Sequence, residues 1–252
     1  MFHGKKMLAT AMFILFIQTM QAQPHYNAWF RGTLSIPVDK NIKIDTEYLH
    51  RRQNGFGNNN MFDNNLMFAV INWVHYQHNE DVKFSLSPFA YFSNYKIIRE
   101  KSDETAKPVS EIRFSGSVEL QNAILKKFYI VNRTALEYRN LESIRDIMRL
   151  RNRFGFRYVF TEKVRFGIYD EILINLTGTT AEHNFDHNRI GFNFEYKVLP
   201  NFKIDFGYIY IVRLPIKSYS KIYENNFSMN VTYQLNKRTK KRSNQRFPGI
   251  EV

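Results

Sequence analysis

The stretch that decides the fold runs from Val164 to Asn175 and reads VRFGIYDEILIN. Its side chains alternate between two sets. One set is Val164, Phe166, Ile168, Asp170, Ile172 and Ile174, and the other is Arg165, Gly167, Tyr169, Glu171, Leu173 and Asn175. Because successive side chains of a β-strand point to opposite faces, this segment predicts a strand with one mainly apolar face and one mainly polar face.

The same two-residue rhythm recurs along the chain. It gives eleven candidate strands at residues 27–36, 42–51, 66–76, 82–93, 111–121, 128–139, 149–160, 164–176, 187–198, 202–213 and 226–235. Most are about ten residues long, which suits a tilted strand that crosses a bilayer. The pattern therefore predicts an all-β fold, an antiparallel up-and-down transmembrane β-barrel of ten to twelve strands.

The connections between these segments alternate in length. Short links lie at 37–41, 77–81, 161–163 and 199–201, and longer polar links lie at 53–65, 95–110, 140–148, 177–186 and 214–225. Outer-membrane barrels have short periplasmic turns and longer outer loops, so the alternation favours that class. An odd number of strands is unusual for bacterial outer-membrane barrels. Either the N-terminus threads back, or the pattern has split one strand in two or missed one. Segment 66–76 is the suspect, because its expected inward face is apolar.

The N-terminal residues have the layout of a secretory signal peptide. A basic pair, Lys5 and Lys6, precedes a short apolar run at 7–20, and Ala22 offers a small residue for cleavage. We expect a signal peptide, a barrel domain and a basic, disordered tail at residues 1–22, 23–235 and 236–252. The chain has no cysteine, so its stability would come from a closed barrel rather than from disulfides.

The net charge of +13 is distributed in a way that argues against nucleic-acid binding. The cations lie in the C-terminal tail or inside strand patterns beside acidic residues, and no nucleic-acid motif accompanies them. A charge that faces lipid costs about 2–4 kcal/mol at mid-depth, so the charged face must point inward. This reasoning predicts a polar network in the barrel interior made of Arg133, Glu137, Arg149, Arg151, Arg153, Glu171, Asn175, Arg189 and Glu195.

Two interpretations of that interior remain open. In the first, salt bridges fill the barrel and hold its wall together, because buried charges must be paired. In the second, the arginines line a channel that attracts anions. Barrels of about eight strands are filled by side chains and those of sixteen or more are open, which favours a filled interior at ten to twelve.

An acidic and histidine-containing loop is the candidate for catalysis. Glu182, His183, Asp186 and His187 lie in a predicted outer loop, where lipid headgroups are accessible. A general base needs a positioned partner, and no serine stands beside these histidines in the chain. The spacing matches no strict metal-ligand pattern, so we predict neither a metal nor a cofactor and leave an enzymatic role open but disfavoured.

Several segments together resemble a family of uncharacterised outer-membrane β-barrels of Gram-negative bacteria, a domain of unknown function. The resemblance rests on an early strand with Trp29 and on segments 149–153, 169–175, 185–191 and 206–208. It implies a barrel and an outer-membrane address, and it implies no reaction or ligand.

The sequence therefore predicts an outer-membrane barrel with a charged, arginine-rich interior. Its role would be structural in the envelope or the passage of small solutes, and its partners would be outer-membrane lipids and small anionic solutes. Two alternatives stay open, a lipid-modifying barrel enzyme and a soluble lipocalin-like barrel with the two faces reversed. The oligomeric state is not predicted.

Overall fold

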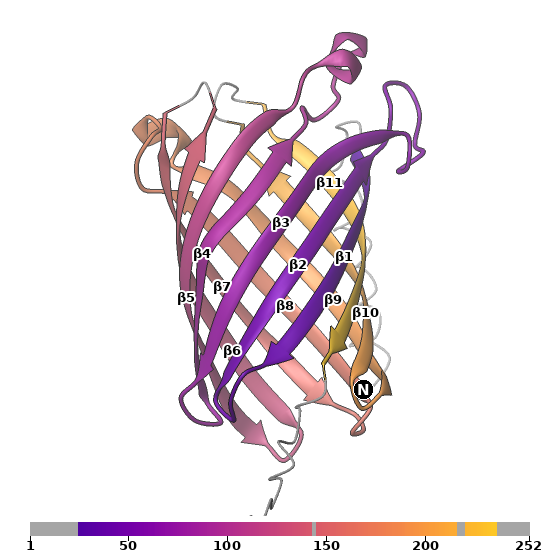
Figure 1. Cartoon of the computed structure of the whole chain (residues 1–252). Coiled ribbons are helices and arrows are strands. Elements are labelled where there is room, and N and C mark those ends of the chain that lie inside the picture. The colour runs from indigo at the N-terminus through magenta and orange to yellow at the C-terminus, as the bar shows by residue number, and fades with distance from the viewer. Residues whose placement is uncertain (1–24, 143–144, 216–219, 236–252) are drawn as a thin grey trace, which may run out of the picture.

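The alternating segments form β-strands that close into a barrel (Figure 1). The computed structural model describes residues 25–142, 145–215 and 220–235. Within these ranges the strands are β1 (His25–Pro37), β2 (Ile42–Gln53), β3 (Asn64–Gln77), β4 (Val82–Asn94), β5 (Val109–Leu125), β6 (Phe128–Leu141), β7 (Ile147–Val159), β8 (Val164–Asn175), β9 (Phe185–Leu199), β10 (Phe202–Arg213) and β11 (Ile222–Gln234). Two short 3-10 helices, η1 (Lys101–Thr105) and η2 (Ala181–His183), lie in loops. No helix in these ranges is long and apolar enough to cross a membrane. The predicted signal peptide and basic tail lie outside the described residues.

The all-β barrel predicted from the alternation is confirmed, and the odd strand count has a structural explanation. Each strand pairs antiparallel with its neighbour in the chain, whereas β1 and β11 pair in parallel and close the sheet. With eleven strands in the described part of the chain, the first and last must run in the same direction. A parallel seam is therefore what closure requires, and no expected strand was split or missed.

Connections of different length lie at opposite ends of the barrel, as the sequence predicted. The short turns after β1, β3, β5, β7 and β9 gather at one end, which we call the turn end, at the bottom of Figure 1. The other connections, including η1 and η2, gather at the opposite end, which we call the loop end. Both β1 and β11 run from the loop end to the turn end.

The suspect segment 66–76 is an ordinary strand, β3, with an apolar inward face. Its inward side chains join those of β2 and β4 in a patch that we call the apolar wall. The apolar wall consists of Leu49, Met67, Ala69, Ile71, Ala90 and Phe92, with Trp73 packed against it. The six side chains of the apolar wall face the interior of the barrel and are each less than 10% exposed, because they pack against one another.

A bulge at Pro88 completes the apolar wall. The register of β4 against β5 shifts between Ser87 and Ala90, and Pro88 and Phe89 are both exposed. Proline cannot donate to the sheet, and a bulge reverses which face the following residues occupy. Ser85 and Ser87 therefore face inward before the bulge, and Ala90 and Phe92 face inward after it.

Candidate functional site

The barrel interior holds a network of ion pairs centred on Glu171 of β8. Its carboxylate accepts hydrogen bonds from Arg151 at 2.8 Å, from Arg153 at 3.2 Å and from Arg189 at 3.1 Å. Arg151 also donates to Glu137 of β6 at 2.6 Å. One guanidinium thus joins two carboxylates on different strands, which the alternation on β6, β7 and β8 makes possible.

The network continues along the loop end. Arg149 donates to Glu137 at 2.5 Å and to Asp186 at 2.6 Å. Arg213 donates to Glu224 of β11 at 2.7 Å, and its Nη1 lies 4.0 Å from Asp186. We call this arrangement the salt-bridge layer; its carboxylates are Glu111, Glu137, Glu171, Asp186 and Glu224, and its cations are Arg113, Arg139, Arg149, Arg151, Arg153, Arg189 and Arg213.

Charged side chains become more exposed toward the turn end. The Arg149 side chain in the salt-bridge layer is 6% exposed, whereas that of Arg165 near the turns is 47% exposed. Lys43 and Lys203, also near the turns, resemble Arg165 in exposure. The interior is therefore closed by side chains at the loop end and more open at the turn end.

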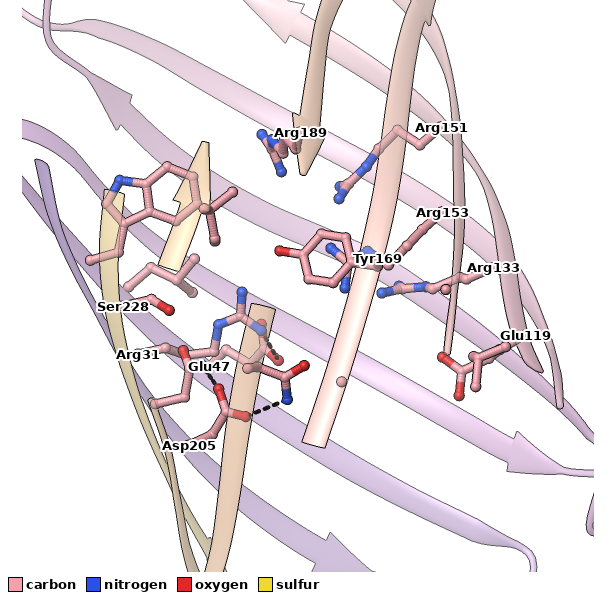
Figure 2. Close-up of a pocket in the computed structure, with 18 of the residues that line it drawn as sticks. Arg31, Glu47, Glu119, Arg133, Arg151, Arg153, Tyr169, Arg189, Asp205 and Ser228 are labelled. Carbon is pink, nitrogen blue, oxygen red and sulfur yellow. Dashed lines mark hydrogen bonds and ion pairs between the residues drawn. The ribbon is translucent and has the colours of Figure 1, made fainter. Parts of the chain in front are cut away.

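An interior cavity of about 1170 Å³ lies between these two ends. Its lining reaches from the turn residues 78–81 to Tyr95 and Leu141 near the loop end. Twelve of the lining residues are arginine and two are lysine, against seven that are aspartate or glutamate. Figure 2 shows Arg133, Arg151, Arg153 and Arg189 extending toward one space. The salt-bridge layer adds four carboxylates that do not line the cavity, namely Glu111, Glu137, Glu171 and Asp186. When these are included, the described cations of the lining still outnumber the described carboxylates.

Trp29 of β1 is the centre of a second group of arginines. Arg51 lies directly opposite it on β2, and the Arg51 guanidinium carbon is 3.5 Å from the Trp29 ring centroid. Arg189 approaches the same ring to 5.7 Å. Arg31 follows two residues later on the same face of β1 and lies 3.7 Å from Glu47. Arginine stacks favourably on aromatic rings, so the indole stabilises Arg51 and Arg189 in the interior.

Two glycines make room for Tyr169 on the inward face of β8. A Cβ on Gly191 would lie 2.3 Å from the Tyr169 ring, and a Cβ on Gly155 would lie 2.8 Å from the Tyr169 Cβ. The ring therefore leans across β9, and the guanidinium carbon of Arg153 on β7 lies 4.2 Å from its centroid. Tyr169 occupies the middle of the cavity view in Figure 2.

A loop contact at the loop end is built on Asp103 of η1. Its carboxylate is paired with Lys96 and accepts the backbone N–H groups of Arg99 and Glu100. Burial of the carboxylate opposes its ionisation, but these hydrogen bonds outweigh burial and lower the pKa of Asp103. The ordered loop therefore depends on an ionised Asp103.

The sequence model of one protein family, described as "Protein of unknown function (DUF2490)", matches residues 26–214. The chain belongs to this family. The resemblance predicted from the sequence is thus confirmed at the level of a family without an assigned function. A search of curated proteins finds no relative of this DUF2490 chain.

A solved structure shares the barrel fold of the DUF2490 chain. It is described as a NanC porin structure in a rhombohedral crystal form, and it is 10% identical in sequence. The match covers 84% of the DUF2490 chain and 100% of the porin chain, with a TM-score of 0.52. At this identity the likeness shows the fold alone.

The structure brings most of the predicted network residues of the DUF2490 barrel together but distributes them over separate groups. Glu195 pairs with Arg165 and Lys203 near the turn end. Arg133 donates to Ser117 rather than to a carboxylate. Asn175 is buried, and its side chain makes no hydrogen bond to the described residues. The remaining predicted residues, Glu137, Arg149, Arg151, Arg153, Glu171 and Arg189, belong to the salt-bridge layer.

The candidate catalytic residues occupy two different environments. Asp186 and His187 follow the first residue of β9 and face inward. The carboxylate of Asp186 lies 3.3 Å from His187 Nδ1 and is bound to Arg149. His183 lies in η2, where its Nδ1 is 3.1 Å from Thr180 Oγ1. Among the described residues no cluster of three or more histidine, aspartate or glutamate side chains could hold a metal ion.

Several residues of the interior were absent from the predicted polar network. Arg31, Tyr169 and Glu224 all line the cavity. The signal for Glu224 was available, because residues 224, 226, 228 and 230 of β11 are polar and alternate along the strand. The expected strand began only at residue 226, two residues after Glu224.

Proposed function

We propose that this DUF2490 chain is an outer-membrane β-barrel whose interior takes up small anionic solutes. The observation that carries the proposal is the cavity with fourteen cationic and seven acidic residues in its lining. Rings of arginine attract anions in pores, and a concave site with charge of one sign concentrates ions of the opposite sign. Solutes would enter from the turn end, because the salt-bridge layer closes the loop end.

The distribution of side chains supports a membrane address. Large apolar residues such as Phe154, Phe192 and Phe206 are exposed on the outside of the barrel, and the charged residues of the same strands point inward. This is the arrangement of a barrel in lipid, where outward charge is costly. Outer-membrane lipids would then cover the exterior. A soluble lipocalin-like barrel would require the opposite arrangement.

The geometry gives less support to a lipid-modifying enzyme. A nucleophile must lie within hydrogen-bond reach of its base. In the described residues no hydroxyl group bonds to His187 or Asp186, which face the interior and are held by Arg149 and Arg213. Asp186 therefore has a structural place in the salt-bridge layer, and His187 lies beside it.

Ion selectivity in planar bilayers tests the proposal. We expect the refolded protein to conduct a small current with a reversal potential that favours chloride over potassium. Arg133→Gln combined with Arg157→Gln should shift that potential toward potassium, because both side chains line the cavity and bond to Ser117 and Gln121 rather than to a carboxylate. An inserted barrel that carries no current, or one that prefers cations, would contradict the proposal.

A further inference from the structure

The apolar wall and the arginines around Trp29 stand side by side in the barrel. The strand register sets Arg31 of β1 opposite Leu49 of β2, Leu49 opposite Ala69 of β3, and Ala69 opposite Phe92 of β4. One row across four strands thus begins with a cation and continues with three apolar residues. Directly opposite residues share a face of the sheet, so the whole row faces the interior.

Three donors in this group have no acceptor within the described ranges. Trp29 Nε1, Arg31 Nε and Arg189 Nε are buried and have no hydrogen-bond partner among the described residues. Trp29 is 8% exposed. Each unpaired atom is a donor, so the group lacks acceptors only. An anion with two or more oxygens would supply them, and an unpaired buried donor costs free energy in its absence.

In the part of the chain that the structure describes, Arg51 has no paired carboxylate, whereas the neighbouring arginines each have one. Its guanidinium interacts repulsively with Arg189, Arg31 and Arg213, and attractively with Glu224. In the described residues Arg51 forms no ion pair with a carboxylate, and its contact is the Trp29 ring. An interior guanidinium that lacks a paired carboxylate is stabilised by a counter-charge.

We infer that the barrel binds a small amphipathic carboxylate, with the carboxylate on Arg51, Arg31 and Trp29 Nε1 and the apolar body against Leu49 and Ile71. The inference rests on the proposed uptake of anions and adds an apolar requirement to it. Leu49, Ile71 and Trp73 all line the cavity beside the arginines. A planar guanidinium matches a carboxylate through two parallel hydrogen bonds, whereas the apolar wall offers nothing to a fully hydrated ion.

Tryptophan fluorescence reports on this site directly. The chain has two tryptophans, Trp29 and Trp73, and both line the cavity. We would titrate the full-length protein in lipid nanodiscs with 4-bromobenzoate, whose bromine quenches fluorescence at contact. 4-Bromobenzyl alcohol is the matched neutral probe, and acetate is the matched probe without an apolar body. We expect saturable quenching by the carboxylate, linear and weaker quenching by the alcohol, and poor competition by acetate.

A pair of matched variants locates the carboxylate. Arg51→Gln removes the cation that stacks on Trp29 and leaves no partner carboxylate unpaired, and we expect it to weaken 4-bromobenzoate binding at least about tenfold. Lys163→Gln makes the same change of charge in the turn between β7 and β8, where the side chain is exposed and outside the cavity lining. We expect it to change binding less than about twofold, because solvent screens a charge at this distance from the ring.

Three outcomes overturn the inference: equal quenching by the acid and the alcohol, quenching that never saturates, or equal effects of the two variants. Leu49→Ser provides a second test, because it should weaken 4-bromobenzoate and leave acetate competition unchanged. If binding fails while bilayer currents still favour chloride, the amphipathic site is wrong and the proposed anion uptake stands. If both fail, the proposed function is wrong as well.

Discussion

At the scale of single residues, the interior depends on how completely each carboxylate is surrounded. Glu171 is the extreme case, because its side chain is 3% exposed and binds three arginines. Glu195 also binds two cations, but its side chain is 18% exposed and its partners reach solvent. We therefore expect the two carboxylates to contribute differently to the stability of the barrel.

Replacing these two residues tests that difference. We expect Glu171→Gln to lower the free energy of unfolding by about 3 kcal/mol or more, since it leaves three clustered arginines without their counter-charge. Glu195→Gln should cost less than about 1 kcal/mol, because exposed ion pairs contribute little. Urea unfolding followed by tryptophan fluorescence in lipid vesicles measures both values. Equal losses of unfolding free energy would show that Glu171 contributes no more to stability than the more exposed Glu195.

At the scale of elements, the parallel seam between β1 and β11 is the least ordinary feature of the barrel. It pairs Leu34 with Tyr233, and both side chains are on the exposed outer face. An antiparallel arrangement of the same two strands would place Leu34 opposite the other end of β11.

Disulfide cross-linking tests the seam, and the absence of natural cysteines makes the result simple to interpret. Leu34→Cys combined with Tyr233→Cys should form a disulfide, because paired Cα atoms of neighbouring strands lie within the range that a disulfide spans. Leu34→Cys with Phe227→Cys should not, since the second site is displaced by six residues, or about 20 Å, along β11. Mobility on non-reducing gels distinguishes the two. Cross-linking in the second pair alone would disprove the parallel register.

At the scale of the whole molecule, the two surfaces of the sheet differ in polarity. The outside is apolar, the inside carries ion pairs, and one sector of the inside is apolar as well. This combination suits a barrel that meets lipid on the outside and an amphipathic anion on the inside.

An outward charge tests the membrane environment of the whole barrel. Phe206 lies near the centre of β10 with 48% of its surface exposed, and Leu199 ends β9 at the turn end. We expect Phe206→Arg to cost about 2–4 kcal/mol and Leu199→Arg to cost about 0–1 kcal/mol, since the cost of a charge in lipid falls toward the interface. Unfolding of both variants from vesicles provides the comparison. Equal and small costs would favour a soluble barrel.

The alternation in the sequence was enough to predict the barrel, and it is also the basis on which the arginines were assigned to one face of each strand. Each strand shows its two faces locally, because the side-chain period of two depends on the backbone alone. For this reason Arg151, Arg153, Glu171 and Arg189 could be placed in one group before any fold was known. The alternating loop lengths likewise predicted which connections share an end.

Closure of the barrel decided the seam and the contacts between strands, because these depend on pairings between residues far apart in the chain. The parallel seam follows from the number of strands, the bulge at Pro88 changes which residues of β4 face inward, and Arg149 meets Asp186 across thirty-seven positions of sequence. The sequence by itself determined the two faces of each strand. Only the tertiary structure decided which arginines have a carboxylate, and that Arg51 and Trp29 face an apolar wall without one.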